Sequence, residues 1–316
     1  MLNPIVLSGA FLGWGLGAND SANIFGTAVS TKMVRYSTAI VLTAGFVILG
    51  AYVDGYRGIA KLSNYAFSGG INTPMEAFFV MLAAAITVAV LTIMKLPVST
   101  SQAVIGAIIG GGLLEGRADF SASLEFFSAW VATPFGAMFI AFILYTLTTK
   151  LIEKRLTHFG FYEVFIRTGY LFAGIIGAYS LGANNVANVT ALFSGQLGIV
   201  TPQQAALIGG ISIAIGVLTY SKPVMSTVGE SIVHLSPIAG LLVVISVSLT
   251  AYFYALIGIP VSTSQAVVGA IVGIGLKTGI KTIHFKTLKK ILFGWIGTPT
   301  AAGLISFLLS IYVHRV

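Results

Sequence analysis

The sequence predicts an all-α integral membrane protein with about ten to twelve transmembrane, broken or re-entrant helices in two inverted-topology repeats. Three observations predict this fold class: an apolar composition, apolar segments along the whole chain, and motifs that occur twice. Of the 316 residues, 56% are hydrophobic and 8% are charged. The mean hydropathy is +0.96. Ordinary soluble domains do not reach such values.

Apolar segments of spanning length recur from end to end, and a helix needs about 20 such residues to cross a bilayer. The clearest segments are Ile5–Val29, Ala39–Val53, Met75–Met94, Phe126–Leu147, Gly169–Ala191, Ile238–Ile257 and Ile291–Val313. Three shorter segments, Val98–Leu114, Ala205–Leu218 and Val261–Leu276, either cross where neighbouring protein covers their ends or form broken or re-entrant helices. The chain has no cysteine, which excludes disulfides and thiolate metal sites.

Two motifs reveal an internal duplication. The octapeptide PVSTSQAV occurs at Pro97–Val104 and at Pro260–Val267, 163 residues apart. The motif GANDSAN at Gly17–Asn23 returns as GANNVAN at Gly182–Asn188, 165 residues apart. Nearly equal offsets exclude a chance match. Five apolar segments lie in each half, and an odd number of crossings turns the second copy upside down, as in many secondary transporters.

The halves and their charges predict an orientation. We expect residues 1–150 to form the first repeat, 151–168 a cytoplasmic connecting loop, and 169–316 the second repeat. With ten crossings, the odd-numbered loops carry 13 basic residues and the remaining loops and the tail carry 4. The positive-inside rule then places the odd-numbered loops in the cytoplasm and both termini on the outer side of the cell (inner) membrane. This retention explains the net charge of +8 without nucleic acid, since no aromatic-rich basic stretch accompanies it.

The duplicated asparagine motif predicts a cation site. Asp20 and Asn23 are three residues apart in an apolar run and share a helix face. A carboxylate near the bilayer centre costs about 2.5–3.5 kcal/mol unless a cation, a proton or a protein partner offsets it. Every Lys and Arg lies near a segment end, so no basic side chain is an obvious partner for Asp20 within the membrane. A bound cation is therefore favoured over a protein partner. The second copy offers Asn185 and Asn188, and hard cations prefer such oxygen ligands. The alternative is that these side chains only bond neighbouring helices.

The octapeptide predicts an anion site. Proline suits the start of a helix, and Ser99, Thr100 and Ser101 then supply N-cap hydroxyls and free backbone N–H groups. Gln102 adds one amide. Such a helix start attracts an anion with tetrahedral oxygens, and two starts related by the repeat would hold it from both sides. The alternative is a capping motif that only begins a half-helix. Together, the two motifs favour cation-coupled anion transport.

Rival classes follow from the same residues. A channel would conduct without coupling, and a sulfate permease would use similar helix-start chemistry. An intramembrane hydrolase needs a base near Ser101 or Ser264, and the sequence provides none. Na⁺ is preferred over H⁺ because amides and hydroxyls carry protons poorly, although Asp20 alone could bind a proton.

These motifs resemble the inorganic phosphate transporter (PiT) family, over essentially the whole chain. GANDSANIFGTAVS is similar to the family's amino-terminal signature and GANNVANV to its second copy. KLPVSTSQAVIGAIIGGGL and GIPVSTSQAVVGAIVGIGL resemble its paired serine-threonine motifs, and TVGESI also matches its pattern. Ser21 and Ile24 stand where valine and alanine are commoner, and no long central hydrophilic loop is present, as in compact prokaryotic members.

The resemblance implies a secondary active transporter, not an enzyme, that imports inorganic phosphate by cation symport through alternating access. It implies Na⁺ or H⁺ as the coupling ion and a homodimer in the bilayer. With the preference for Na⁺ given above, we expect Na⁺-coupled symport without another cofactor, and H⁺-coupled phosphate or metal-phosphate symport is the alternative. The implied phosphate ligands are Thr100, Ser101, Gln102, Thr263, Ser264 and Gln265. The implied Na⁺ ligands are Asp20, Asn23, Asn185, Asn188, Gln102, Gln265, Thr100 and Thr263.

Overall fold

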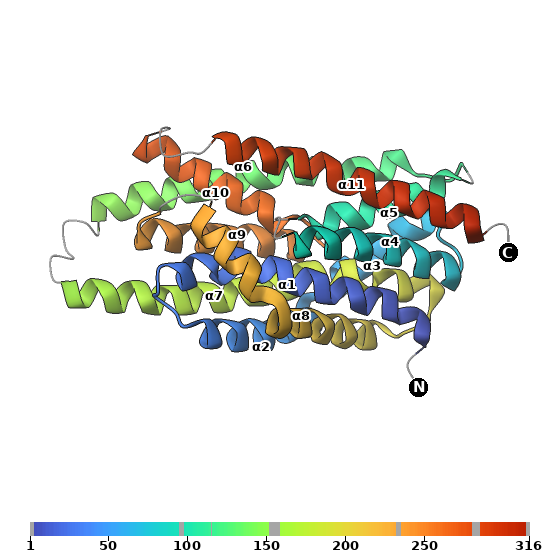
Figure 1. Cartoon of the computed structure of the whole chain (residues 1–316), viewed down its shortest axis with the longest axis horizontal. Helices are drawn as coiled ribbons and strands as arrows, with labels where there is room; N and C mark the ends of the chain where they lie inside the picture. The colour runs from blue at the N-terminus through green and yellow to red at the C-terminus, as the bar shows by residue number, and fades with distance from the viewer. Residues whose placement is uncertain are drawn as a thin grey trace.

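The computed structural model describes residues 3–94, 98–114, 116–151, 159–231, 235–279 and 285–313, and these residues form eleven α-helices and no strand. The helices are α1 (Leu7–Ser30), α2 (Tyr36–Asp54), α3 (Tyr56–Ser68), α4 (Pro74–Ile93), α5 (Thr100–Leu113), α6 (Phe120–Leu151), α7 (Phe159–Thr190), α8 (Pro202–Ser231), α9 (Pro237–Leu256), α10 (Thr263–Thr278) and α11 (Phe285–Val313). Most run along the long axis of the molecule, and the two termini lie at the same end (Figure 1). The all-α prediction is confirmed.

Seven helices in the described part of the chain are long and apolar enough to cross a membrane: α2, α4, α6, α7, α8, α9 and α11. Helix α1 has 24 residues but is not among them, because the polar side chains of the GANDSAN motif lie within it. The ten crossings assumed in the charge tally are therefore not confirmed. Of the predicted connecting segment 151–168, residues 152–158 lie outside the described residues, as do Lys95, Leu96 and Pro97. Leu151 ends α6, and residues 159–168 belong to the start of α7.

Equivalent caps begin α4 and α9. Thr73 accepts a hydrogen bond from the Glu76 backbone N–H at 3.2 Å, and the Glu76 carboxylate accepts one from the Thr73 N–H at 3.0 Å. Such a capping box satisfies backbone donors that a helix leaves unpaired at its start. Ser236 caps α9 through the Ala239 N–H at 3.4 Å. A proline follows both caps, at Pro74 and at the start of α9, where its fixed φ suits a first turn.

The three short apolar segments differ in the helices that they form. Helices α5 and α10 contain 14 and 16 residues, or roughly 21 and 24 Å at 1.5 Å per residue, less than the ~30 Å hydrocarbon thickness. For Val98–Leu114 and Val261–Leu276, both alternatives, a crossing with covered ends and a broken or re-entrant helix, are compatible with these lengths. For Ala205–Leu218, the alternative of a broken or re-entrant helix is not met, because this segment belongs to the 30-residue helix α8, which is long and apolar enough to cross a membrane.

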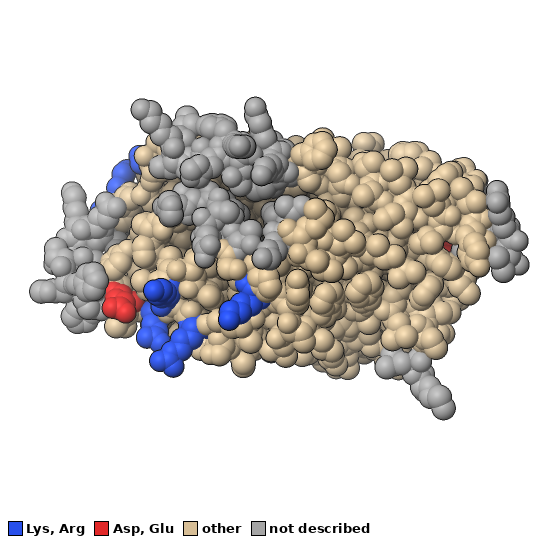
Figure 2. Space-filling model, in the orientation of Figure 1, with Lys and Arg blue, Asp and Glu red and all other residues tan. Residues whose placement is uncertain are grey.

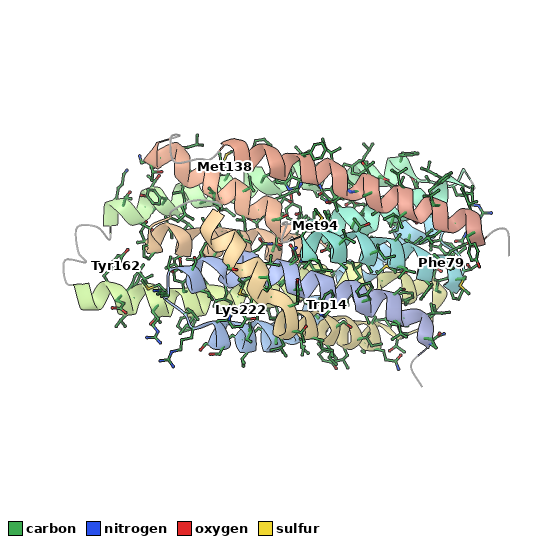
Figure 3. All side chains as sticks on the ribbon, in the orientation of Figure 1. Trp14, Phe79, Met94, Met138, Tyr162 and Lys222 are labelled. Atoms are coloured by element: carbon green, nitrogen blue, oxygen red, sulfur yellow. The ribbon has the colours of Figure 1, made fainter. Side chains whose placement is uncertain are left out.

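The two pairs of helices that flank the octapeptides lie at opposite ends of the molecule. In Figure 1, α4 and α5 occupy the right-hand half and α9 and α10 the left-hand half. Figure 3 shows Phe79 of α4 near the right-hand end and Met94, the residue after α4, near the middle. Helix α4 therefore ends halfway along the molecule.

Helices of the two halves pack against each other in a reciprocal way. Helix α1 packs against α8 and its counterpart α7 against α2, while α5 packs against α11 and α10 against α6. Glycines permit the closest contacts: a Cβ at Gly106 would lie 2.3 Å from the Pro299 carbonyl oxygen, and one at Gly269 would lie 2.0 Å from the Pro134 carbonyl oxygen. Both contacts occur at equivalent positions of the duplication.

Charge is unevenly distributed along the long axis. On the face in Figure 2, Lys and Arg gather toward the end opposite the termini, and most of the remaining described surface carries neither sign. Several basic residues lie at helix ends on that side: Lys32 and Arg35 follow α1, Lys150 lies near the end of α6, and Lys277 lies near the end of α10. A surface with few charges suits the hydrocarbon layer of a bilayer.

Candidate functional site

Two helix starts lie at the breaks near the middle of the chain's long axis. Ser99 and Ser262 are the N-cap residues of α5 and α10, and both are buried. Their hydroxyls accept hydrogen bonds from the backbone N–H groups of Gln102, at 3.4 Å, and Gln265, at 3.3 Å. The predicted N-caps are therefore present. The remaining first-turn N–H groups have no carbonyl of their own helix to bond, and they carry the positive end of its dipole.

The octapeptide residues 98–104 and 260–267 are buried, and some of their polar atoms are unpaired. Ser101 bonds the Ser99 hydroxyl at 3.3 Å, and Ser264 bonds the Ser262 hydroxyl at 2.9 Å. Three atoms of these motifs, in contrast, lack a hydrogen-bond partner within the described structure. They are Thr100 Oγ1, Gln102 Oε1 and Gln265 Oε1.

The first asparagine motif faces the start of α10. Asn23 Nδ2 donates to Thr263 Oγ1 at 3.0 Å, across a sequence separation of 240 residues. The Asp20 carboxylate is hydrogen-bonded to the same threonine, while its Oδ1 atom has no partner in the described structure. The prediction that Asp20 and Asn23 share a helix face agrees with this arrangement. One hydroxyl of the second half thus joins both ligand candidates of the first.

The second motif lies on α7, which contacts α5. Asn188 Nδ2 donates to Asn185 Oδ1 at 3.0 Å, and both residues are buried. Asn188 Oδ1 and Asn185 Nδ2 have no partner among the described atoms. The equivalent of the Asn23–Thr263 bond would join Asn188 to Thr100, but Asn188 donates to its own helix instead. The two copies of the motif therefore differ in hydrogen bonding. They also differ in sequence, because only the first copy carries a carboxylate, Asp20.

The first asparagine of each motif has a different role from its neighbours. Asn19 bonds Val98 and Thr92, at the break between α4 and α5. Asn184 bonds Val261 and Ile259, at the break between α9 and α10. The sequence placed these residues inside the motifs but gave no signal for their partners, because the contacts join segments more than 70 residues apart.

The donor set suits a hard monovalent cation better than a transition metal. It combines one carboxylate with amide and hydroxyl oxygens, which favour hard cations. Among the described residues, no group of three or more His, Cys, Asp or Glu side chains could hold a metal. The two salt bridges of the described residues join Arg57 to Asp54 and Lys61 to Glu125, so neither involves Asp20. A cation at Asp20 would compensate a buried charge.

Comparison with known proteins identifies the family. The model of the phosphate transporter family matches residues 16–306, nearly the whole chain. This chain belongs to the phosphate transporter family. It is therefore a multi-pass membrane transporter, and not an enzyme.

Relatives and a solved structure extend the comparison. The chain is 30% identical over 298 residues to a "putative phosphate permease" of Methanocaldococcus jannaschii, with 93% of this chain and 92% of the relative covered. It is 26% identical over 387 residues to a protein of the same name from Thermococcus kodakarensis, with 96% and 95% covered. A solved structure named as the sodium-dependent phosphate transporter superposes with a TM-score of 0.85 at 21% identity, with 99% of this chain and 98% of that chain covered. That likeness establishes the fold.

Proposed function

We propose that this phosphate transporter imports inorganic phosphate together with Na⁺, and that it works by alternating access. The proposal combines the family, the buried oxygen ligands around Asp20 and the polar helix starts of α5 and α10. The name of the solved relative, a sodium-dependent transporter, supports the choice of cation.

The observation that carries the proposal is a set of unpaired buried polar atoms within the two duplicated motifs. They are Asp20 Oδ1, Thr100 Oγ1, Gln102 Oε1, Asn185 Nδ2, Asn188 Oδ1 and Gln265 Oε1. A buried polar atom without a partner costs about 1–3 kcal/mol. Six such atoms within the duplicated motifs are hard to reconcile with a purely structural role and are expected of a site that binds a polar solute.

Ligand roles follow from charge. Phosphate would accept hydrogen bonds from Thr100, Ser101, Gln102, Thr263, Ser264 and Gln265 and from the N–H groups of both helix starts. Na⁺ would bind Asp20, Asn23, Asn185 and Asn188, with oxygens of Gln102, Gln265, Thr100 and Thr263 completing its shell. Cation and anion would then neutralise each other. Either alone would leave an unpaired charge in a low-dielectric interior, which opposes the conformational change.

Alternating access is suggested by an inverted relationship between the halves. The helix pairs α4–α5 and α9–α10 enter from opposite ends and stop near the middle (Figure 1). The reciprocal contacts of Gly106 with Pro299 and of Gly269 with Pro134 are expected if each half uses the same surface against the other. Rocking of one repeat, residues 1–150, against the other, residues 169–316, would expose the central site to either side in turn.

The distribution of charge suggests how the protein sits in the cell (inner) membrane. The basic end in Figure 2 would face the cytoplasm together with segment 151–168, and both termini would lie outside. The protein would function as a homodimer, as the family resemblance implies.

Proton coupling is the second candidate, and one observation favours it. Asp20 is the buried carboxylate of the site, and its Oδ1 atom is unpaired in the described structure, so a proton could replace Na⁺ there. The ligands that Asn23 and Thr263 would offer to a cation argue against this, because neither titrates.

The test is radiolabelled phosphate uptake into proteoliposomes with an imposed Na⁺ gradient or an imposed pH gradient. Inward Na⁺ should drive accumulation above equilibrium, with competition from arsenate and little from sulfate. Accumulation driven only by the pH gradient would show that the coupling ion is H⁺ and not Na⁺. Uptake that never exceeds equilibrium would indicate a channel, and strong sulfate competition would indicate a broader oxyanion permease.

A further inference from the structure

Two buried asparagines next to the proposed ligands hold the helix breaks rather than facing the unpaired atoms. We propose that Asn19 and Asn184 are positioning residues that fix the starts of α5 and α10 where phosphate binds. The inference rests on the proposed function, because it assigns these helix starts to phosphate.

Asn19 uses both ends of its amide across the break between α4 and α5. Its Oδ1 accepts a hydrogen bond from the Val98 backbone N–H at 3.2 Å, and its Nδ2 donates to Thr92 Oγ1 at 3.1 Å. Thr92 lies in the last turn of α4, and Val98 immediately precedes the N-cap Ser99. The side chain of Asn19 is 1% exposed. One residue of α1 therefore fixes where α4 ends and α5 begins.

Asn184 does the same in the second half with different partners. Its Oδ1 accepts from the Val261 N–H at 3.0 Å, and its Nδ2 donates to the Ile259 carbonyl oxygen at 3.0 Å. These residues flank Pro260, which has no N–H to donate, and Val261 immediately precedes the N-cap Ser262. In both copies, Oδ1 of the asparagine accepts a hydrogen bond from the backbone N–H of the residue before the N-cap. The Nδ2 group donates to a side chain, Thr92, in the first copy and to a backbone carbonyl, Ile259, in the second.

This arrangement matters because the breaks lack the regular bonding of a helix. A buried backbone N–H needs a partner, and for Val98 and Val261 that partner comes from α1 and α7. Helices α1 and α7 also carry Asp20 and Asn185. The same two helices thus bear the cation ligands and set the position of the phosphate ligands, and a binding site needs such positions held within about 0.5 Å.

The first test measures the phosphate KM and Vmax of uptake. Asn19→Leu should raise KM about tenfold, because one buried hydrogen-bonded pair is worth roughly that factor, with Vmax changed less than twofold. Thr92→Val should also raise KM, and Thr92→Ser, which keeps a hydroxyl, should have the wild-type KM. In the double variant Asn19→Leu/Thr92→Val, KM should be no higher than in Asn19→Leu alone.

The matched control is Thr87→Val, on the same helix. The hydroxyl of Thr87 is also buried, but it bonds the Ala83 carbonyl of its own helix at 2.9 Å. Its loss should leave KM unchanged. A KM shift in Thr87→Val equal to that in Thr92→Val would overturn the positioning role, as would fully additive effects of Asn19→Leu and Thr92→Val.

A second measurement needs no transport. Hydrogen exchange of the purified protein should become faster at the Val98 amide in Asn19→Leu and at the Val261 amide in Asn184→Leu, each without change at the other site. Wild-type exchange at both sites in folded variants overturns the positioning role, as does faster exchange with an unchanged KM. Absence of phosphate uptake by the wild type would instead remove the proposed function, and the inference with it.

Discussion

Asn23 of α1 donates a hydrogen bond to Thr263 at the start of α10, over 3.0 Å and 240 residues of sequence. The same threonine is hydrogen-bonded to the Asp20 carboxylate. A residue of the second half therefore holds two cation-ligand candidates of the first half in place. If the halves move relative to each other, this contact is one that the motion must change.

Removal of the Thr263 hydroxyl tests this contact. We expect Thr263→Val to raise the Na⁺ concentration for half-maximal phosphate uptake about tenfold, since a ligand oxygen and the partner of Asn23 are both lost. Thr263→Ser should behave as wild type. The control Thr250→Val removes a buried hydroxyl that bonds its own helix at Ser246 O. An equal Na⁺ shift in that control would contradict the prediction.

The unequal copies predict an effect of Asn185→Asp. This change gives the second copy the carboxylate that the first has at Asp20, next to Asn188, whose Oδ1 is unpaired in the described structure. A buried charge without Na⁺ destabilises the protein, and Na⁺ bound to the folded state stabilises it. The melting temperature of Asn185→Asp should therefore rise more steeply with Na⁺ than that of the wild type, with choline as the control salt. Equal slopes would argue against a cation near Asn185.

Glycine contacts between the halves predict a selective loss of stability. Gly106→Ala and Gly269→Ala place a Cβ 2.3 and 2.0 Å from backbone carbonyl oxygens of α11 and α6, and backbone must move to relieve this. We expect each change to reduce the free energy of unfolding by about 1–3 kcal/mol. Gly294→Ala, with no atom within 4 Å of its new Cβ, is the control. Thermal denaturation in detergent measures the difference, and a similar melting temperature for all three variants would contradict it.

A second contact between the halves is centred on Asp54. Asp54, at the end of α2, accepts hydrogen bonds from Tyr179 Oη at 2.5 Å and from Tyr252 Oη at 3.4 Å, and it pairs with Arg57 at 3.2 Å. The shorter bond should matter more. Tyr179→Phe should cost about 1–3 kcal/mol of unfolding free energy, and Tyr252→Phe less than half as much. If thermal denaturation shows a larger loss of stability for Tyr252→Phe than for Tyr179→Phe, the two distances do not predict which hydrogen bond contributes more to stability.

Local features of the site were predictable from the sequence. The serine N-caps follow from proline and three hydroxyl residues, and the shared face of Asp20 and Asn23 follows from helical spacing. Duplication also identified the short helices α5 and α10. Each of these features depends on residues within one or two turns of one another, which a single sequence contains.

Contacts between distant segments were not predictable. Nothing in the sequence pairs Asn23 with Thr263, or Asn19 with Thr92 and Val98. The predicted apolar segment Ala205–Leu218 is shorter than α8, because Thr219 and the polar residues after it end the apolar run. In the structure, the hydroxyls of Thr219 and Ser221 bond carbonyls of their own helix at 2.7 and 2.6 Å, so the helix continues.

Phosphate binding to the purified protein in Na⁺ and in choline tests the central claim most directly. Cation and phosphate are proposed to share one buried site, with Asp20 as the charged cation ligand. Calorimetric titration should therefore detect phosphate binding to the wild type in Na⁺, and at least tenfold weaker binding in choline or in Asp20→Asn. Equal phosphate affinity in both salts, or full Na⁺ dependence in Asp20→Asn, would contradict the account.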